Sequence, residues 1–264
     1  MQHTRLASVK GVFYPDSCTK LSIYFKKFRE YNKNQKIPNI TPRAIIVPHA
    51  GYVYSGFTAN QAYEYLSNTD PKRLIVIGPS HRHYFKGISA SYYEEYETPC
   101  GNIPIDTNYL IKLSQTLPIG FEPKAHTQEH STEVQMPFIH HYLPKTPVIE
   151  LIYGDIALST LSHIITTLLE DKDNILVIST DLSHFHTKTK AKEHDIHCIE
   201  ALKKLSIPLL KSCEACGLLG LKALLLSAKQ KNLTPHLLDY RTSADYSQDE
   251  SRVVGYMSAV LSDA

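Results

Sequence analysis

The sequence predicts an α/β fold: a single domain whose mainly parallel central sheet is covered by helices on both faces. Short, nearly continuous apolar runs rich in β-branched residues recur along the chain, and such runs are typical of strands buried on both sides. Segments with helical periodicity lie between these runs, and this alternation indicates parallel strands joined by helical crossovers. The 264 residues suffice for one large domain, and we expect it to span residues 1–264.

The expected elements follow in chain order. A first helix is expected at residues 16–31, where Asp16 or Ser17 would cap its start. Buried strands are expected at 44–47, 73–78, 146–154 and 174–180, and a last strand at 251–262. Further helices are expected at 55–66, 131–143, 158–170 and 212–231, the last of them long and mostly buried. Residues 31–42 predict a loop, and the short alternating segments of residues 84–106 predict a β-hairpin or a sheet-edge extension.

Composition excludes several classes of function. The formal net charge is only +2 and no long run of Lys or Arg occurs, so we expect no nucleic-acid partner. No apolar stretch approaches the roughly 20 residues of a membrane span, and the first residues do not resemble a signal peptide. The five cysteines are odd in number and irregularly spaced, which argues against a disulfide framework. A cytoplasmic protein is therefore expected.

Three of the predicted strands end in a histidine. His49 follows the first strand, His81 the second, and His184 the fourth, just beyond Asp181. Ligands bind in open α/β sheets outside the carboxyl ends of the strands, so neighbouring strands would bring these imidazoles together. A lone loop histidine is more often solvated or a helix cap. Three at equivalent positions favour a transition-metal site.

Two further segments carry candidate residues. In "QEHSTEVQMPF", His130, Ser131 and Glu133 stand at an expected helix start, where Ser131 could simply be the cap. In "CEAC", Cys213 and Cys216 are three residues apart, but no second pair completes a four-cysteine zinc site. Either cysteine could be a small buried hydrophobe. Cys216 is the better candidate, because the glycine after it allows close backbone approach.

Ordinary hydrolase and nucleotide motifs are missing from the sequence. It contains no G-x-S-x-G nucleophile elbow, no P-loop, no G-x-G-x-x-G and no H-E-x-x-H. A zinc hydrolase is also disfavoured, because no carboxylate has a spacing that makes it the base for a metal-bound water.

The motifs together resemble those of a known family. In order, "PHAGYVYSG", "GPSH", "EHSTEVQMPF", "STDLSH" and the Cys216–Gly217 pair are similar to motifs of the Memo family, whose bacterial members are called AmmeMemoRadiSam system protein B. The resemblance runs from "GVFYP" to the terminal "VVGYMSAV". It implies a fold like that of the class III extradiol dioxygenases, whose ancestral feature is a mononuclear non-haem iron site.

Carried onto the matching positions, the resemblance implies a metal site and its surroundings. The implied ligands are His49, His81 and Cys216, the last where the dioxygenases use a glutamate. The implied catalytic residues beside the metal are His184, His130 and Asp181. The expected pocket residues are Tyr52, Tyr54, Ser80, Ser131 and Glu133. A thiolate ligand favours soft metals and can itself be oxidised, so the expected cofactor is Fe(II) or copper.

The leading functional hypothesis is a redox-active non-haem iron or copper enzyme with a dioxygenase-like site that acts on an unknown small molecule. An alternative is a non-catalytic binding module that uses the same pocket for a peptide or protein partner. A third possibility, implied by the bacterial family name alone, is an accessory role beside a radical-SAM protein and an AMMECR-like protein.

Overall fold

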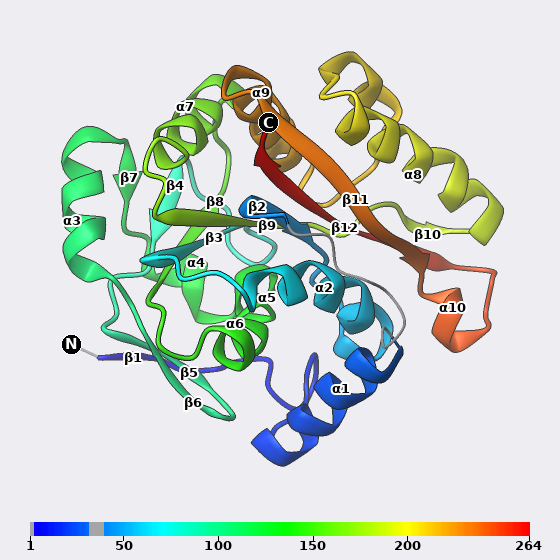
Figure 1. Cartoon of the computed structure of the whole chain (residues 1–264), viewed down its shortest axis with the longest axis horizontal. Helices are drawn as coiled ribbons and strands as arrows, with labels where there is room; N and C mark the ends of the chain where they lie inside the picture. Colours follow the sequence, from blue (N-terminus) through cyan, green and yellow to red (C-terminus); the bar gives the residue numbers. More distant parts are fainter. Residues whose placement is uncertain (1–2, 32–39) are drawn as a thin grey trace.

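The computed structural model describes residues 3–31 and 40–264 and, within them, builds a nine-stranded sheet through the middle of the molecule (Figure 1). In spatial order the strands are β10 (His184–His186), β12 (Val253–Asp263), β2 (Pro42–Val47), β9 (Asn174–Ser179), β3 (Arg73–Pro79), β8 (Val148–Tyr153), β4 (Ile88–Ala90) and β7 (Ile119–Gly120). The ninth strand, β11 (Leu233–Thr242), pairs with β12.

The sheet is mixed: its centre is parallel, antiparallel pairs flank the centre, and the edge strand β7 is again parallel to β4. Strands β2, β9, β3 and β8 run parallel to one another, and every residue of β2, β8 and β9 is buried. On one side β12 is antiparallel to β2, and on the other β4 is antiparallel to β8. The prediction of a mainly parallel sheet is therefore right for these four strands and wrong for the whole. The reason is that the chain end returns as the antiparallel pair β11–β12.

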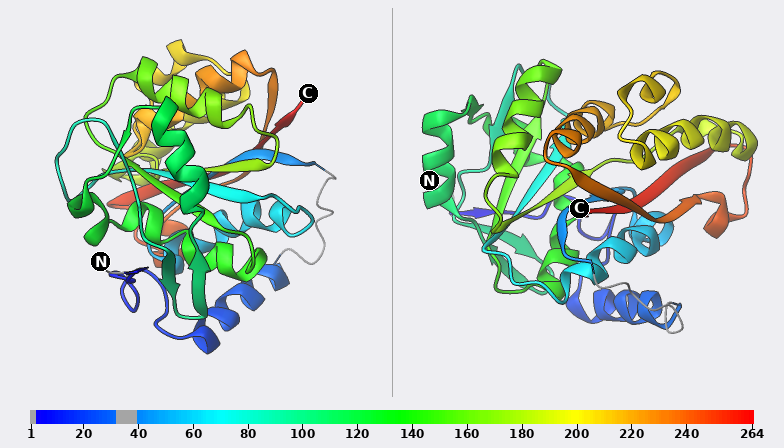
Figure 2. Two further views of the ribbon diagram at one scale, coloured as in Figure 1. Left: turned by 90° about the vertical axis from the view of Figure 1, so that its left-hand side faces the viewer. Right: turned by 45° about the horizontal axis from the view of Figure 1, so that its top comes forward.

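Helices cover both faces of the sheet (Figures 1 and 2). Strand side chains alternate between two apolar cores: Ala44 and Ile46 of β2 belong to one, Ile45 and Val47 to the other. The first core is covered by α3 (Thr107–Thr116), α7 (Leu158–Leu168), α8 (Lys188–Lys203) and α9 (Leu218–Gln230). The second is covered by α1 (Cys18–Tyr31), α2 (Tyr52–Leu66) and α6 (Met136–Tyr142). The prediction of helices on both faces is confirmed.

The irregular middle of the chain forms both of the expected alternatives. Strands β5 (Glu95–Thr98) and β6 (Gly101–Pro104) are an antiparallel hairpin, and β1 (Thr4–Arg5) joins it in a small separate sheet. Strand β4 meanwhile extends the edge of the main sheet. The remaining helical turns are α4 (Pro123–Thr127), α5 (His130–Glu133), the 3₁₀ turn η1 (Ile207–Ser212) and α10 (Ala244–Ser247).

Several predicted boundaries change. The helix expected at 131–143 is split into α5 and α6, and Pro137 lies in the first turn of α6, where its missing N–H costs nothing. The helix expected at 212–231 begins only at Leu218, after the loop that carries Cys216. Strand β11 was not expected. Of the two residues predicted to cap the start of α1, Ser17 makes a hydrogen bond of this kind: its Oγ accepts from the amide of Lys20 (3.4 Å). Most of the loop expected at 31–42 lies outside the described residues.

The cysteine prediction is wrong. Disulfides join Cys18 to Cys100 and Cys198 to Cys213, and Cys216 is the one free thiol in the described chain. The paired cysteines are 82 and 15 residues apart, so their spacing carried no visible signal. The expectation of a cytoplasmic protein loses the support it took from unpaired cysteines. Among the described residues, no helix is both long and apolar enough to cross a membrane.

Candidate metal centre

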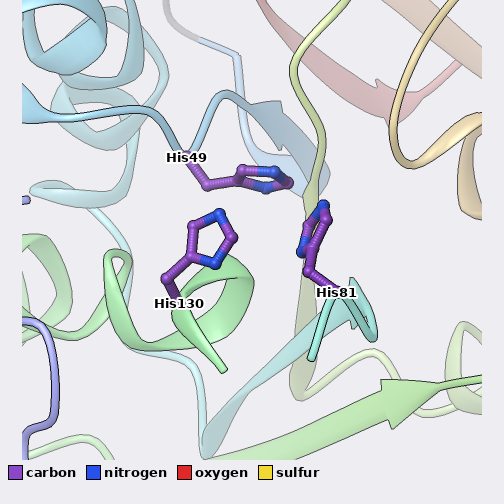
Figure 3. A group of neighbouring side chains, drawn as sticks. All are labelled: His49, His81 and His130. Carbon is purple, nitrogen blue, oxygen red and sulfur yellow. The ribbon is translucent and has the colours of Figure 1, made fainter. Parts of the chain in front are cut away.

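Three histidines meet outside the carboxyl ends of the central parallel strands. Figure 3 shows the imidazoles of His49, His81 and His130 facing one another, and one nitrogen of each lies within 4.8 Å of the others. The ring centroids are 5.2 Å apart for His49 and His81, 5.3 Å for His49 and His130, and 4.6 Å for His81 and His130. His49 follows β2, His81 follows β3, and His130 opens α5.

The hydrogen bonds of Ser179 define the tautomer of His49. Ser179 Oγ donates to the carbonyl of Ser131 (2.5 Å) and accepts from Gln135 Nε2 (2.9 Å), so it can only accept from His49 Nδ1, 2.9 Å away. The proton of the neutral ring is therefore on Nδ1, and Nε2 carries the lone pair. Burial, together with the neighbouring His81 and His130, lowers the pKa of His49 well below its usual value and keeps the ring neutral.

His81 is oriented by a carboxylate that the sequence reasoning missed. Glu129 is fully buried, and its Oε1 lies 2.9 Å from His81 Nδ1 while its Oε2 accepts from the His81 amide at 2.5 Å. Burial alone would raise the pKa of Glu129, but the hydrogen bonds and charge of His81 outweigh it and hold this pKa at about 2. An ionised Glu129 places the His81 proton on Nδ1, so Nε2 again carries the lone pair.

His130 is held less firmly. Its Nδ1 lies 3.3 Å from Glu129 Oε1, but the alignment is poor and this buried nitrogen makes no hydrogen bond. The ring of Phe13 packs against it, with centroids 4.7 Å apart. Burial lowers the pKa of His130 despite the nearby negative charge of Glu129. An orphaned, neutral imidazole nitrogen beside two others is well suited to bind a ligand.

Cys216 adjoins the cluster on the side of His49, but it is not one of the residues whose ligand atoms all lie within 4.8 Å of one another. Its Sγ lies 3.1 Å from His49 Nε2, the nitrogen that carries the lone pair, and the amide of Asp181 donates to the sulfur at 3.2 Å. Burial and the charge of Asp181 raise the pKa of the thiol to about 12. The next residue, Gly217, donates from its amide to Thr180 Oγ1 (2.9 Å) and packs tightly against the end of β9.

Asp181 and His184 adjoin the cluster in different ways. Asp181 Oδ1 accepts from the amides of His49 (2.8 Å) and Ala50 (3.3 Å), and so fixes the loop that carries His49. Burial raises the pKa of Asp181. His184 donates from Nδ1 to the carbonyl of Leu182 (2.8 Å), which leaves its Nε2 as a proton acceptor.

A model of the family described as Memo-like protein matches residues 5–260. The chain belongs to the Memo family. Three curated relatives, each named a MEMO1 family protein, cover 97 or 98% of this Memo-family chain and 99, 99 and 98% of their own lengths. The protein of Sulfurisphaera tokodaii is 33% identical, that of Methanobrevibacter smithii 32% and that of Aquifex aeolicus 30%.

Among solved structures, this Memo chain is similar to the crystal structure of an uncharacterized protein from Escherichia coli K12. The TM-score is 0.51 at 15% identity, over 82% of this chain and 98% of the other. The likeness concerns the fold alone.

The residues expected to line the pocket make separate contacts in the structure and do not form one wall. Ser131 Oγ donates to the Pro79 carbonyl (2.8 Å), and it is not the cap of α5, because Glu129 takes that place. Ser80 Oγ donates to the carbonyl of His83 (2.7 Å). Tyr52 is buried and donates to the Val134 carbonyl (2.9 Å), whereas Tyr54 is exposed with its ring near Tyr246.

Glu133 serves the amino-terminal segment instead of the histidines. Its carboxylate pairs with Arg5, and it accepts hydrogen bonds from the amides of Ser8 (2.9 Å) and Val9 (2.7 Å) and from the Tyr14 hydroxyl (2.9 Å). These contacts engage both of its oxygens. The Memo motif "EHSTE" thus carries two buried glutamates with different tasks, one holding His81 and the other the start of the chain.

Proposed function

We propose that this chain binds one Fe(II) or copper ion through His49 Nε2, His81 Nε2 and Cys216 Sγ, and that it is a redox enzyme acting on a small molecule. One observation carries the proposal: the Nδ1 atoms of both histidines are engaged by Ser179 and Glu129, which leaves both Nε2 lone pairs for a metal. The free thiol lies 3.1 Å from one of these nitrogens.

The donor set fits the proposed ion. Neutral imidazoles and a thiolate suit iron and copper better than hard ions such as Mg²⁺ or Ca²⁺. His130 is the rival third ligand, because one of its ring nitrogens lies within 4.8 Å of a nitrogen of His49 and of His81. Cys216 is preferred because its sulfur already contacts the metal-facing nitrogen of His49. When bound, such an ion supplies one-electron chemistry and coordination positions open to a substrate.

The surrounding residues have distinct tasks in this proposal. His184 accepts a proton at Nε2, because its Nδ1 proton is held by the Leu182 carbonyl. His130, whose ring lies beside those of His49 and His81, contacts a bound substrate or holds a proton. Asp181 orients the His49 loop through the two backbone amides it accepts from.

Metal content and affinity test the proposal. Protein purified without oxygen is analysed by elemental mass spectrometry and then titrated with Fe(II) and with Cu(I), for the unchanged chain and for His81→Ala, Cys216→Ser and His130→Ala. The exposed His163 on α7 supplies the control His163→Ala. We expect near one equivalent of metal in the unchanged and control proteins and loss in the first two variants.

The same experiment decides between the rivals. Loss of metal in His130→Ala but not in Cys216→Ser would replace the thiol with the third imidazole. An unchanged protein that binds neither ion would overturn the proposal. If metal binds but the loaded protein consumes no oxygen with any candidate substrate, the redox reading fails and the binding-module alternative, with a peptide partner, takes its place.

A further inference from the structure

A second cluster of metal-type ligands lies on the surface, on α8, β10 and the loop that leads to Cys216. His186 Nε2 is 2.7 Å from Glu214 Oε2, and His194 Nδ1 is 3.5 Å from Glu214 Oε1. The two imidazoles stack with centroids 4.9 Å apart. All three side chains are open to solvent, with exposed fractions of 24, 28 and 46% for His186, His194 and Glu214. An ion from solution can therefore reach them.

One ligand atom of each residue lies within 4.8 Å of those of the other two, a spacing from which a small divalent ion can gather them. Ligand atoms at about 2.0–2.2 Å from a tetrahedral zinc are roughly 3.3 Å apart. The present separations from the two imidazoles to Glu214 are 2.7 Å at Oε2 and 3.5 Å at Oε1, on either side of that value. Two imidazoles and one carboxylate are a common zinc donor set, and water would fill the fourth position at this exposed place. Lys190, one turn before His194 on α8, opposes a cation, but the charge of Glu214 offsets it.

The framework around the cluster holds its members in place. Cys198 lies one turn after His194 on α8, and its disulfide to Cys213 ties the helix to the residue just before Glu214. The Cys198 sulfur also contacts the Glu214 carbonyl at 3.7 Å. Two of the three ligands therefore remain near one another without any ion.

The third ligand is supplied by an irregular strand. Between His184 and His186, β10 shifts its register against β12, and Phe185 has a φ of 63°, a left-handed conformation that is costly for a residue with a side chain. Bulges of this kind re-aim side chains. One three-residue strand thus carries one histidine beside the candidate metal centre and another at the surface cluster.

We propose that His186, His194 and Glu214 form a second metal site that binds Zn²⁺, separate from the centre at His49 and His81. The disulfide Cys198–Cys213 preorganises this site. The proposal does not depend on the proposed redox function, because it shares no ligand with that centre.

Zinc titration of the full chain tests the site. The background is His49→Ala with His81→Ala, so that of the two clusters found among the described residues only the surface one is intact. Binding is followed by calorimetry and by zinc content after dialysis. We expect one equivalent of Zn²⁺ in this background and in the same background with His163→Ala. Adding His186→Ala or His194→Ala should weaken binding at least about 100-fold, more than the 10–100-fold typical of losing a supporting residue.

Two outcomes would overturn the proposal. One is a background protein that binds no zinc; the other is zinc affinity unchanged by both histidine substitutions. Because His186 and His194 are solvent-accessible, replacing either of them is not expected to unfold the background protein, and circular dichroism checks the fold of the background and of each variant. Replacing the disulfide by Cys198→Ala with Cys213→Ser should weaken zinc binding about 10-fold. Unaltered affinity in that variant would contradict the role assigned to the disulfide.

Discussion

Two histidine–glutamate pairs in this molecule look alike and differ in what surrounds them. At the candidate centre, His81 Nδ1 lies 2.9 Å from Glu129. In the sealed interior, His126 Nδ1 lies 2.7 Å from Glu150. Both glutamates have no exposed surface, and both have a lowered pKa. The contact between imidazole and carboxylate therefore does not distinguish the two pairs.

The second nitrogen of each ring separates them. His126 Nε2 is bonded to Ser89 Oγ (2.8 Å), and the order hydroxyl, imidazole, carboxylate is that of a hydrolase triad. However, Ser89, His126 and Glu150 are at most 1% exposed, and Ser89 Oγ also accepts from the Glu122 amide (2.8 Å). His81 is 27% exposed, and its Nε2 has no hydrogen-bond partner in the described part of the chain. Of these two carboxylate-paired imidazoles, only that of His81 therefore keeps its second nitrogen available to a ligand.

The largest expected effect is on stability, when the buried pair of His126 and Glu150 is broken. Glu150→Ala should lower the free energy of unfolding by about 3–5 kcal/mol, because it leaves His126 buried without its partner. The hydroxyls of Thr132 (2.5 Å) and Tyr96 (3.2 Å) lose an acceptor as well. Urea denaturation measures the change, with the exposed Glu193→Ala as a control expected to stay within about 0.5 kcal/mol. A loss under 1 kcal/mol would show that the pair contributes little.

The counterpart at the candidate centre should affect metal binding instead. Glu129→Gln is expected to lower Fe(II) affinity about 10–100-fold, because His81 loses the charged acceptor that fixes its tautomer. Anaerobic titration measures the affinity. Glu150→Gln is the matched control and should leave it within about threefold. Equal losses in both variants would mean that the substitutions act through general destabilisation.

A smaller effect is expected at Ser89. Ser89→Ala removes the hydrogen bonds to His126 and to the Glu122 amide and should cost about 1–2 kcal/mol of stability. It should alter neither metal content nor hydrolysis of activated esters. Any esterase activity that disappears with Ser89 would show that the interior opens and that the triad order has a catalytic meaning.

The smallest expected effect is on how the free energy of unfolding changes as the pH falls into the acid range. Burial alone would raise the pKa of Glu150, but the charge and hydrogen bond of His126 outweigh it and lower this pKa. Its stabilising contribution is thus present above the unfolded-state value of about 4.5 and is lost as the pH falls through the folded-state pKa. Unfolding free energies at pH 5.5 and pH 3.5 should therefore differ less in Glu150→Gln than in the unchanged protein. An identical difference would contradict this account.

The sequence allowed the central strands and their histidines to be predicted because both signals are local. The runs before His49 and His81 are apolar and β-branched, and neighbouring parallel strands then bring their ends together. The antiparallel flanks were missed, because pairing direction depends on where the last hairpin returns. Strand β11 mixes proline and polar residues among its apolar ones and lacks a clear alternation.

Long-range partners could not be predicted. Glu129 acts on His81 across 48 residues, and Glu133 on the amino-terminal segment across about 125, so neither task is visible in "QEHSTE". The pairing of Cys198 with Cys213 likewise depends on the turn between α8 and α9. In each case the partner depends on which distant segments pack together in the fold. The residue type alone is compatible with several partners.

Gly217 determines how near the sulfur of Cys216 can come to His49. A Cβ at this position would lie 2.7 Å from the Cβ of Thr180 and 3.0 Å from the Ser179 carbonyl, closer than packed atoms tolerate. Any side chain would push the start of α9 away from β9 and draw the thiol back with it. A residue without a side chain thus sets the span between His49 Nε2 and Cys216 Sγ.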